Sequence, residues 1–277
     1  MTGSLGFAVA AAVLLGSSDL LAARAARGAS SLTVTRTVVL VSLVLSPLLL
    51  LVGDWTWVAA DVLLGASSGL AMITGLMLIY RGYAVARMGV VAPLSSVLLA
   101  TVPIVWDVVF GRRPGTLGWV GIAIGLIALV LTTATPSSDG SVAVGAVLGL
   151  TSGVAFGAAY TLMGEVGEGS GLVPVIAQRT AGSALLLVVW FVRRGEFIAT
   201  GSSRRPAMVA GVLALSAIAC LQSAFQGGAS GPVAVAASQF ASVAVVLSVI
   251  VDGERMRWWQ AIGVASTAVA VGCIAVG

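Results

Sequence analysis

Charged side chains are rare in this sequence, and a few of them lie inside long apolar stretches. Asp19 lies late in the apolar run 4–23, and Arg36 lies early in the next run, 32–52. An ionised group in apolar surroundings is costly, so it usually pairs with another charge or faces a cavity. Because one short connection separates the two runs, Asp19 and Arg36 have similar depth, and we expect them to form an ion pair.

This expected pair has two interpretations, which are compatible with each other. It could be purely structural, or it could be a coupling site for protons or cations at which a substrate competes for either partner. Coupling to a proton gradient through Asp19 and uncoupled exchange both agree with the residues.

Other polar side chains in or near apolar runs are candidates for binding a small molecule. They are Tyr80, Ser95, Ser96, Tyr160, Arg179 and Gln239. Hydrogen bonds between packed helices explain most groups of this kind. We single out Gln239, because a mid-helix amide is costly to bury without a partner. Asp107 lies nearer the end of a run and is expected to reach water or Arg112.

The composition does not support enzymatic or metal-binding chemistry. The chain has no His, and all fourteen basic residues are Arg, so His-based triads, His ligands and a phosphate-loop Lys are absent. Cys220 and Cys273 lie in separate apolar runs and form no zinc cluster. We therefore expect no enzyme, no metal and no cofactor. The net charge of +4 is small and the Arg residues are dispersed, so no nucleic-acid partner is expected.

The composition favours a bilayer as the solvent. Hydrophobic residues make up 59% of the 277 residues and charged residues only 9%, whereas soluble domains carry about 25% charged residues. Runs of about 20 apolar residues are long enough to cross a membrane as helices. We predict an all-α integral membrane protein with about ten such spans, at 4–23, 32–52, 58–80, 89–110, 116–135, 141–163, 173–193, 207–226, 231–251 and 257–276. The seven tryptophans fall near the predicted ends, where amphipathic rings favour the interface.

Glycines recur every four residues in the sixth predicted span. Gly145, Gly149, Gly153 and Gly157 would share one helix face, where another backbone can approach closely. This stripe predicts tight packing within the protein or, alternatively, a surface that slides during a conformational change.

The sequence contains an internal repeat. Shifted by 142 positions, Gly89 falls on Gly231, and the later turn Gly111-x-Arg113 falls on Gly253-x-Arg255. We predict a first five-helix repeat at 1–135, a linker at 136–140 and a second five-helix repeat at 141–277. Because five is odd, the second copy must enter the membrane in the opposite orientation, and this inverted-topology plan is common in secondary transporters.

The two copies differ in their charges. Arg179 falls one residue from the shifted position of Arg36, and Tyr160 falls near that of Asp19, so the second copy keeps the guanidinium but not the carboxylate. Glu165 is the acid expected nearest to Arg179. The two arginines could bind an anionic group in a cavity or anchor the protein near the interface.

Three motifs resemble those of the drug/metabolite transporter superfamily, in its ten-helix EamA-type branch. They are Gly16-Ser17-Ser18-Asp19, Gly89-Val90-Val91-Ala92-Pro93-Leu94 and Gly253-Glu254-Arg255. The resemblance covers essentially the whole chain, although Arg112 stands where the family usually has Glu. It implies carriage of small metabolites or drugs.

We therefore expect a permease in the cytoplasmic membrane that moves a small molecule by alternating access, with lipid as its other partner. The alternative is a membrane scaffold without transport. Such a protein would have a filled interior, in which Asp19, Arg36 and Arg179 are all paired.

The distribution of Arg predicts the orientation. Eleven of the fourteen Arg residues lie in or next to the connections after predicted helices one, three, seven and nine, and the other three lie on the opposite side. Because basic residues in short loops stay in the cytoplasm, both termini are expected outside, in contrast to the usual arrangement of the family.

Overall fold

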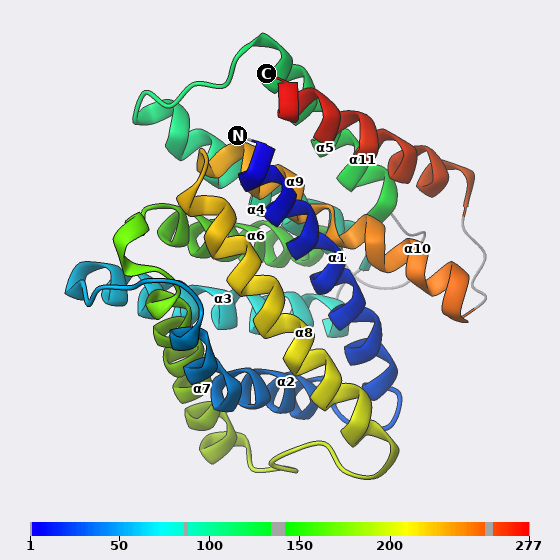
Figure 1. Ribbon diagram of the computed structural model, residues 1–277. Coiled ribbons are helices and arrows are strands. Elements are labelled where there is room, and N and C mark those ends of the chain that lie inside the picture. Colours follow the sequence, from blue (N-terminus) through cyan, green and yellow to red (C-terminus); the bar gives the residue numbers. More distant parts are fainter. Residues whose placement is uncertain (1, 86–87, 134–141, 253–256, 277) are drawn as a thin grey trace.

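The computed structural model describes residues 2–85, 88–133, 142–252 and 257–276, and the regular structure in these residues is helical throughout (Figure 1). The predicted linker 136–140 and the Gly253-Glu254-Arg255 turn lie outside the described residues. The elements are α1 (Thr2–Ala25), α2 (Ser31–Leu45), η1 (Ser46–Leu51), α3 (Ala59–Val85), α4 (Met88–Val109), α5 (Thr116–Thr133), α6 (Val142–Gly164), η2 (Glu168–Ser170), α7 (Val173–Arg193), α8 (Gly201–Gln226), α9 (Ser230–Ser238), α10 (Phe240–Asp252) and α11 (Trp258–Val276).

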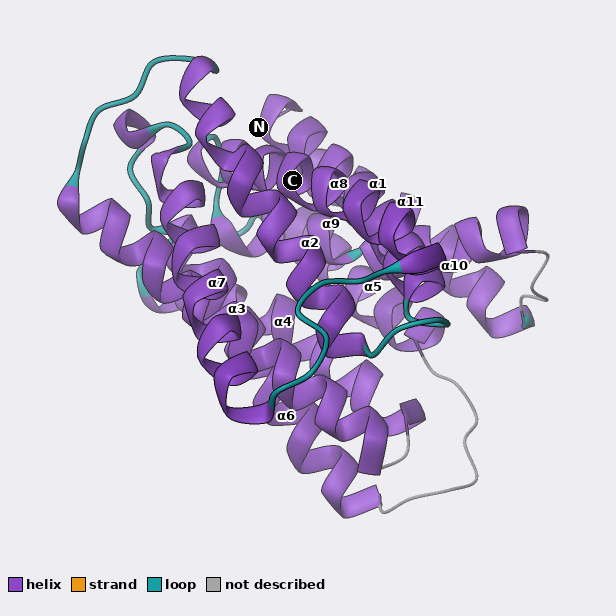
Figure 2. Cartoon of the chain, turned by 90° about the horizontal axis from the view of Figure 1, so that it is seen from below, coloured by secondary structure: helices purple, strands orange, loops and turns teal. Residues whose placement is uncertain are grey.

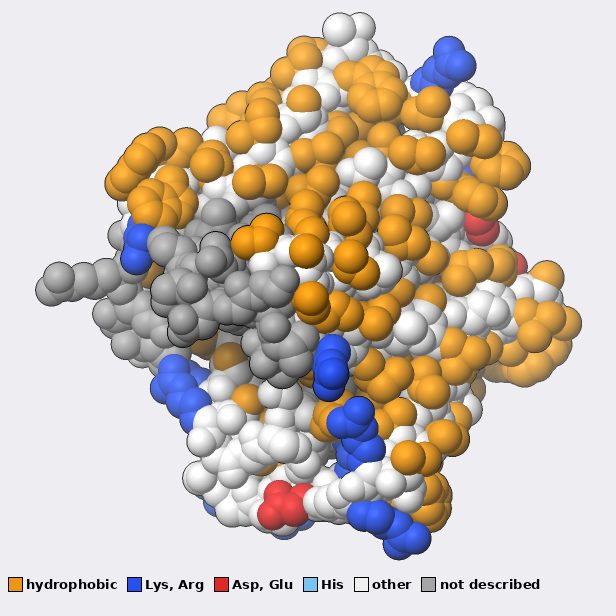
Figure 3. Space-filling view, turned by 180° about the vertical axis from the view of Figure 1, so that it is seen from behind, with side chains coloured by type: hydrophobic (Ala, Val, Ile, Leu, Met, Phe, Trp, Pro, Cys, Tyr) orange, Lys and Arg blue, Asp and Glu red, His pale blue; other side chains and the backbone are white. Residues whose placement is uncertain are grey.

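Seven helical segments in the described residues are long and apolar enough to cross a membrane. They are Gly3–Ala25, Ser31–Leu51, Ala59–Gly82, Val142–Gly164, Val173–Arg193, Gly201–Gln226 and Ser230–Val251. Three further apolar helices are shorter, at Leu94–Val109, Thr116–Leu131 and Trp258–Ile274. Hydrophobic side chains cover much of the face in Figure 3, and most of the Arg side chains visible there lie in its lower half. The chain has the make-up of a helical membrane protein.

The ninth predicted span, 231–251, is not one regular helix, because α9 and α10 meet at Gln239. The backbone amide of Gln239 bonds to the carbonyl of Ala236, and its side-chain Nε2 donates to the Val235 carbonyl. The side chain therefore occupies the carbonyl that a continuous α-helix would offer to the backbone amide at this position. A mid-helix glutamine is compatible with either arrangement, so the sequence pattern did not indicate this break.

Helices far apart in the sequence form the main contacts. α1 packs against α8, and α3 packs against α6 and α7. α4 lies on α6, α5 lies on α11, and α10 lies on α1. Figures 1 and 2 show the same helices from two directions, with the two chain ends near each other in both. Consecutive helices are therefore often not neighbours.

The contacts define two ends of the helix bundle. At the terminal end, the start of α1 meets the end of α8 through a hydrogen bond from the Ser4 hydroxyl to the Ala224 carbonyl, 2.7 Å. At the arginine end, Arg36 near the start of α2 bonds to the connection between α7 and α8. This second end also carries Arg81, Arg193 and Arg194, at the ends of α3 and α7.

Candidate functional site

Asp19 lies on α1, less than two turns before its end, and its side chain is exposed. It makes no hydrogen bond or ion pair within the part of the chain that the structure describes. Its charge nevertheless acts on two tyrosines from other helices, Tyr80 of α3 and Tyr160 of α6. A carboxylate within an apolar span is expected to face a cavity or a partner rather than lipid.

The neighbourhood of Asp19 includes the break between α9 and α10. A Cβ added to Gly16, almost one turn before Asp19, would lie 2.8 Å from the Phe240 carbonyl oxygen. Only a residue without a side chain allows this approach of two backbones. Gly16 of the Gly-Ser-Ser-Asp motif therefore holds α1 against the first residue of α10, three residues before Asp19.

The two tyrosines differ in their partners. The Tyr80 hydroxyl accepts a hydrogen bond from the Thr35 hydroxyl, at 3.2 Å, so it links α3 to α2. Tyr160 is buried, and its ring packs edge-on against Phe225 of α8 with centroids 5.7 Å apart. Asp19 thus lies within electrostatic range of Tyr80 and Tyr160, which the sequence singles out separately.

The ion pair predicted between Asp19 and Arg36 is wrong. The Arg36 Nη1 donates to the carbonyl oxygens of Glu196 and Phe197, at 2.8 and 3.2 Å. The physical reason is the packing of α8, which contacts both α1 and α2 and leaves little direct contact between them (Figure 1). Equal depth on consecutive helices therefore did not imply proximity.

The prediction that Glu165 is the acid nearest to Arg179 is also not supported by any contact. Arg179 is buried on α7 and its Nη2 donates to the Gln178 side-chain oxygen, at 3.2 Å. The Gln178 amide nitrogen in turn donates to the Ser68 hydroxyl of α3, at 2.8 Å. Arg179 thus belongs to a buried contact between α3 and α7, while Glu165 pairs elsewhere.

The remaining candidates use their polar atoms in contacts within and between helices. The Ser95 hydroxyl accepts a hydrogen bond from Ser152 of α6, and the Ser96 hydroxyl donates to the carbonyl of Ala92. The Gln239 side-chain oxygen accepts a hydrogen bond from Thr267 of α11, at 3.0 Å. We therefore carry only Tyr80 and Tyr160 from the predicted binding set into the proposed site.

The glycine stripe of α6 lies on α4. Added Cβ atoms at Gly149, Gly153 and Gly157 would come within 2.7 to 2.9 Å of backbone carbonyl oxygens of that helix. Gly145 is buried at the start of the same stripe. The two helices are therefore in backbone contact over three successive turns, which is the geometry of close small-residue packing.

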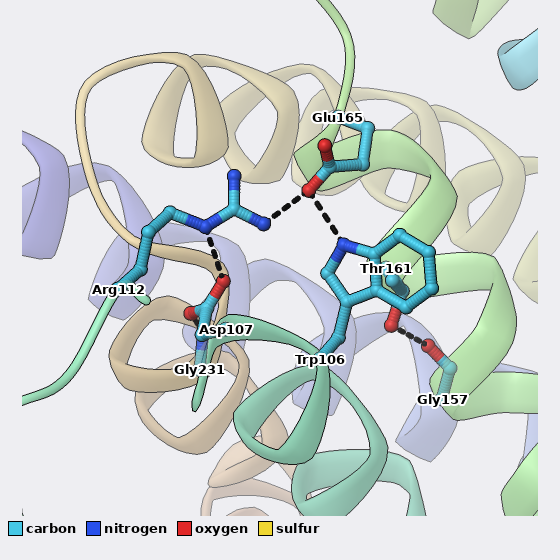
Figure 4. Close-up of polar contacts among 7 residues, drawn as sticks. All are labelled: Trp106, Asp107, Arg112, Gly157, Thr161, Glu165 and Gly231. Carbon is cyan, nitrogen blue, oxygen red and sulfur yellow. Dashed lines mark hydrogen bonds and ion pairs between the residues drawn. The ribbon is translucent and has the colours of Figure 1, made fainter. Parts of the chain in front are cut away.

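A cluster of polar contacts lies at the terminal end, and we call it the latch (Figure 4). It consists of Trp106, Asp107, Arg112, Glu165 and Gly231. Arg112 forms ion pairs with Asp107, at 3.0 Å from Nε to Oδ1, and with Glu165. Glu165 also accepts from the Trp106 indole, at 2.8 Å, and Asp107 accepts from the Gly231 amide. The expectation that Asp107 reaches Arg112 is confirmed.

The latch joins two helix connections to a third helix. Arg112 follows α4, Glu165 follows α6, and Gly231 is the second residue of α9. The hydrogen bond to Glu165 holds the pKa of Arg112 above its ordinary value, so the guanidinium stays charged. Sequence analysis names Arg112 as one of two expected partners of Asp107, but it misses the contacts of Glu165, which lies more than fifty residues away, and of Trp106, which directly precedes Asp107.

Two further contacts tie the connection between α6 and α7 to its surroundings at the terminal end. The Asp61 carboxylate of α3 accepts hydrogen bonds from the Ser170 hydroxyl and the Gly167 amide. The Gln226 amide of α8 donates to the carbonyls of Gly167 and Gly171, the latter at 2.9 Å. Four helices thus converge on this closed end.

One buried group at the terminal half lacks partners. Gln222 of α8 is fully buried, and both polar atoms of its side chain make no hydrogen bond in the described residues. The internal repeat of the sequence could have identified this position, because a shift of 142 positions places the candidate site residue Tyr80 on Gln222. Unpaired buried amides are unusual, so Gln222 is a candidate for a group that water reaches in another conformation.

Comparisons with known proteins give a fold but no activity. No family model matches the sequence, and no curated protein matches it. A solved structure described only as "Crystal structure of protein" superposes with a TM-score of 0.78. The match covers 96% of this chain and 94% of the other at 13% identity, so the likeness extends over both chains and shows the fold alone.

Proposed function

We propose that this chain is a secondary transporter that moves a small metabolite or drug across the cytoplasmic membrane by alternating access. The observation that carries the proposal is the exposed Asp19 within an apolar span, without a partner in the described residues and in electrostatic range of Tyr80 and Tyr160. Membership of the drug/metabolite transporter superfamily is part of the same proposal.

The packing supports two related five-helix repeats. Counting the three shorter apolar helices as spans gives ten, with α9 and α10 as one. Each helix can be replaced by its counterpart in the other half. The pairs are α1 with α6, α2 with α7, α3 with α8, α4 with α9–α10, and α5 with α11. After this replacement, the main helix–helix contacts correspond to main contacts again. The α1–α8 contact becomes α6–α3, the α3–α7 contact becomes α8–α2, and α4–α6 becomes α10–α1. The α5–α11 contact is converted into itself.

Glycine contacts follow the same exchange. Gly69 of α3 lies against the backbone of α7 and Gly211 of α8 lies against that of α2, and these two glycines are 142 positions apart. Gly157 lies near the Leu98 carbonyl and Gly16 near the Phe240 carbonyl, and the two carbonyls are also 142 positions apart. Such an inverted repeat would place the binding site between the two halves, where Asp19 and Tyr160 come from opposite copies.

Within this proposal the described conformation is closed at the terminal end by the latch. Opening that end requires separation of Arg112 from Glu165 and of Asp61 from the α6–α7 connection. It would also hydrate Gln222, which is buried without partners in the closed form. The α4–α6 glycine contact is then the surface along which the halves would slide.

The scaffold alternative receives less support. It requires a filled interior with each of its charges paired, whereas Asp19 is exposed and has no partner in the described residues. An unpaired carboxylate in an apolar span serves no packing purpose and is typical of ion or substrate pathways.

Water access to Asp19 tests the proposal without knowledge of the substrate. In a chain with Cys220 and Cys273 replaced by Ser, Asp19→Cys should react with a positively charged, membrane-impermeant thiol reagent. Val13→Cys is the matched control, because Val13 is 47% exposed on the same helix and is expected to face lipid. Equal lack of reaction at both positions, from either side of the membrane, would contradict a water-filled site.

The orientation also remains a proposal, with the arginine end in the cytoplasm. A C-terminal alkaline phosphatase fusion should then be active and a C-terminal GFP fusion dark. The reverse result would place both termini inside, and the arginine end outside.

A further inference from the structure

A pocket of about 460 Å³ lies at the arginine end, between α2, the end of α7 and the connection that follows α7. Three guanidinium groups line it, from Arg36, Arg193 and Arg194, together with a single carboxylate, Glu196. The hydroxyl residues Ser30 and Thr33 complete its polar wall. The lining is therefore net positive, and it is separate from Asp19.

Arg36 is the unusual member of this lining because it is 5% exposed and has no acidic partner in the described residues. Its Nη1 donates to the Glu196 and Phe197 carbonyls, while its Nε makes no hydrogen bond. A buried arginine is normally paired with a carboxylate or a bound anion. The carbonyls position this guanidinium at the pocket but do not neutralise it.

Arg194 is held at the pocket by a constrained backbone. It is the one non-glycine residue with positive φ, +46°, among those described. Its amide donates to the Trp190 carbonyl, at 2.8 Å, and the Trp190 indole donates to the Gly195 carbonyl, at 2.9 Å. The turn after α7 is therefore fixed from both sides, and strain of this kind is often retained where a ligand is bound.

We propose that this pocket binds the phosphate group of an anionic phospholipid. Arginine forks match phosphate oxygens in geometry as well as in charge. The outer surface of α7 beside the pocket is apolar and exposed, with Val188 at 59%, Phe191 at 62% and Val192 at 79%. A lipid can therefore place its headgroup among the arginines and its acyl chains along α7, whereas a free phosphate would use only the first of these features.

The site lies next to the proposed transport site without being part of it. A smaller pocket of about 200 Å³ shares Leu32 and Arg193 with it and reaches Tyr80. Thr35, which donates to Tyr80, directly precedes Arg36 in α2. Lipid binding does not depend on transport, so the two proposals can fail separately.

The test compares two double variants that each remove two positive charges from the arginine end. Arg193→Gln with Arg194→Gly alters the pocket, and glycine suits the positive φ at position 194. Arg204→Gln with Arg205→Gln is the matched control, because both residues are exposed at the start of α8 and do not line the pocket. Native mass spectrometry with phosphatidylglycerol should show about 30-fold weaker binding for the pocket variant and less than about threefold for the control.

Three results would overturn the proposal. The first is equal loss in both double variants, which would mean general surface attraction. The second is unchanged phosphatidylglycerol binding in the pocket variant. The third is stabilisation of the wild type by millimolar inorganic phosphate to the same extent as by phosphatidylglycerol, which would assign the pocket to free phosphate.

A second variant keeps the test decisive if the pocket variant fails to fold. Glu196 is exposed and its side chain makes no hydrogen bond in the described residues, so Glu196→Gln should fold normally. It removes the one carboxylate of the lining and should strengthen phosphatidylglycerol binding relative to phosphatidylcholine. Weaker or unchanged binding would contradict the proposed location of the phosphate.

Discussion

The two ends of the helix bundle are held together by different kinds of contact. At the terminal end, the latch joins α4 and the connections after α4 and α6 to the start of α9, and Asp61 of α3 and Gln226 of α8 bond to the connection between α6 and α7. At the arginine end, side chains of α2 bond mainly to the backbone of one connection. Arg36 binds the Glu196 and Phe197 carbonyls, and Thr37 accepts from the Ala199 amide.

This difference separates an end tied by side-chain contacts from an end that carries the described pockets. Both pockets described above, and the exposed Asp19, belong to the arginine half. The buried Tyr160 and Gln222 belong to the terminal half. If the halves of the chain are inverted copies, the same five-helix fold is present in two conformations. Alternating access then means that the two halves exchange these conformations. The variants below test that comparison.

The largest effect is expected for Asp19→Asn, because it removes the one exposed carboxylate of the proposed site. If Asp19 couples transport to protons, the variant should lose gradient-driven accumulation of an identified substrate while retaining exchange. Electrical recording from proteoliposomes under an imposed pH gradient measures this loss. Asp54→Asn, at an exposed carboxylate outside the helices, is the control. Wild-type accumulation in Asp19→Asn would show that Asp19 does not couple transport to protons.

The second effect concerns the glycine contact between α4 and α6, along which the two halves would slide. Gly153→Ala places a Cβ 2.7 Å from the Ser95 carbonyl oxygen and should lower the free energy of unfolding by about 2 kcal/mol. Gly6→Ala meets nothing within 4 Å and should raise it by up to about 1 kcal/mol, because alanine favours helix. Denaturant unfolding in detergent compares them. If Gly153→Ala abolishes transport at unchanged stability, the stripe is a sliding surface rather than a packing contact.

The third effect tests the latch directly. Arg112→Gln removes the ion pairs with Asp107 and Glu165 and should favour the open terminal end by about 1.4 kcal/mol, which is about tenfold in population. The alkylation rate of a Gln222→Cys reporter should rise by the same factor. Arg113→Gln, one residue further along, is the control for the loss of a charge. Equal rates in the two variants would mean that the latch does not hold this end closed.

The sequence predicted what depends on composition and on periodicity along one helix. Apolar runs of sufficient length identified α1 to α8, although α8 begins six residues earlier than predicted and a 3-10 helix, η1, completes the second span. The Gly149–Gly157 spacing predicted a backbone contact without identifying its partner. The Asp107–Arg112 contact was predictable because it spans one short turn. These features are local, so pattern alone constrains them.

What could not be predicted depends on which helices become neighbours. Arg36 was assigned to Asp19 because α1 and α2 are consecutive, but α8 contacts both. Glu165 was assigned to Arg179, but it lies beside Arg112 because α4 and α6 pack together and end at the same place. The break at Gln239 depends on a side chain competing with the backbone for the Val235 carbonyl. A single sequence carries no direct signal for these contacts.

The smallest effect, and the one with the sharpest control, is expected at Gln222. Its amide is buried and has no hydrogen-bond partner among the described residues, so the terminal end carries an unsatisfied donor and acceptor there. Gln222→Met keeps the length of the side chain and removes both groups, which should stabilise the closed state by about 1 kcal/mol. The thermal midpoint should rise, and transport should slow because the amide would be hydrated only in the open state.

Gln226→Met makes the same change one turn later, where the amide donates to the Gly167 and Gly171 carbonyls, and it should destabilise the closed end by about the same amount. Opposite signs in thermal unfolding of these two variants would show that hydrogen-bond satisfaction decides the balance, whereas equal destabilisation would mean that Gln222 has an essential partner in the closed state.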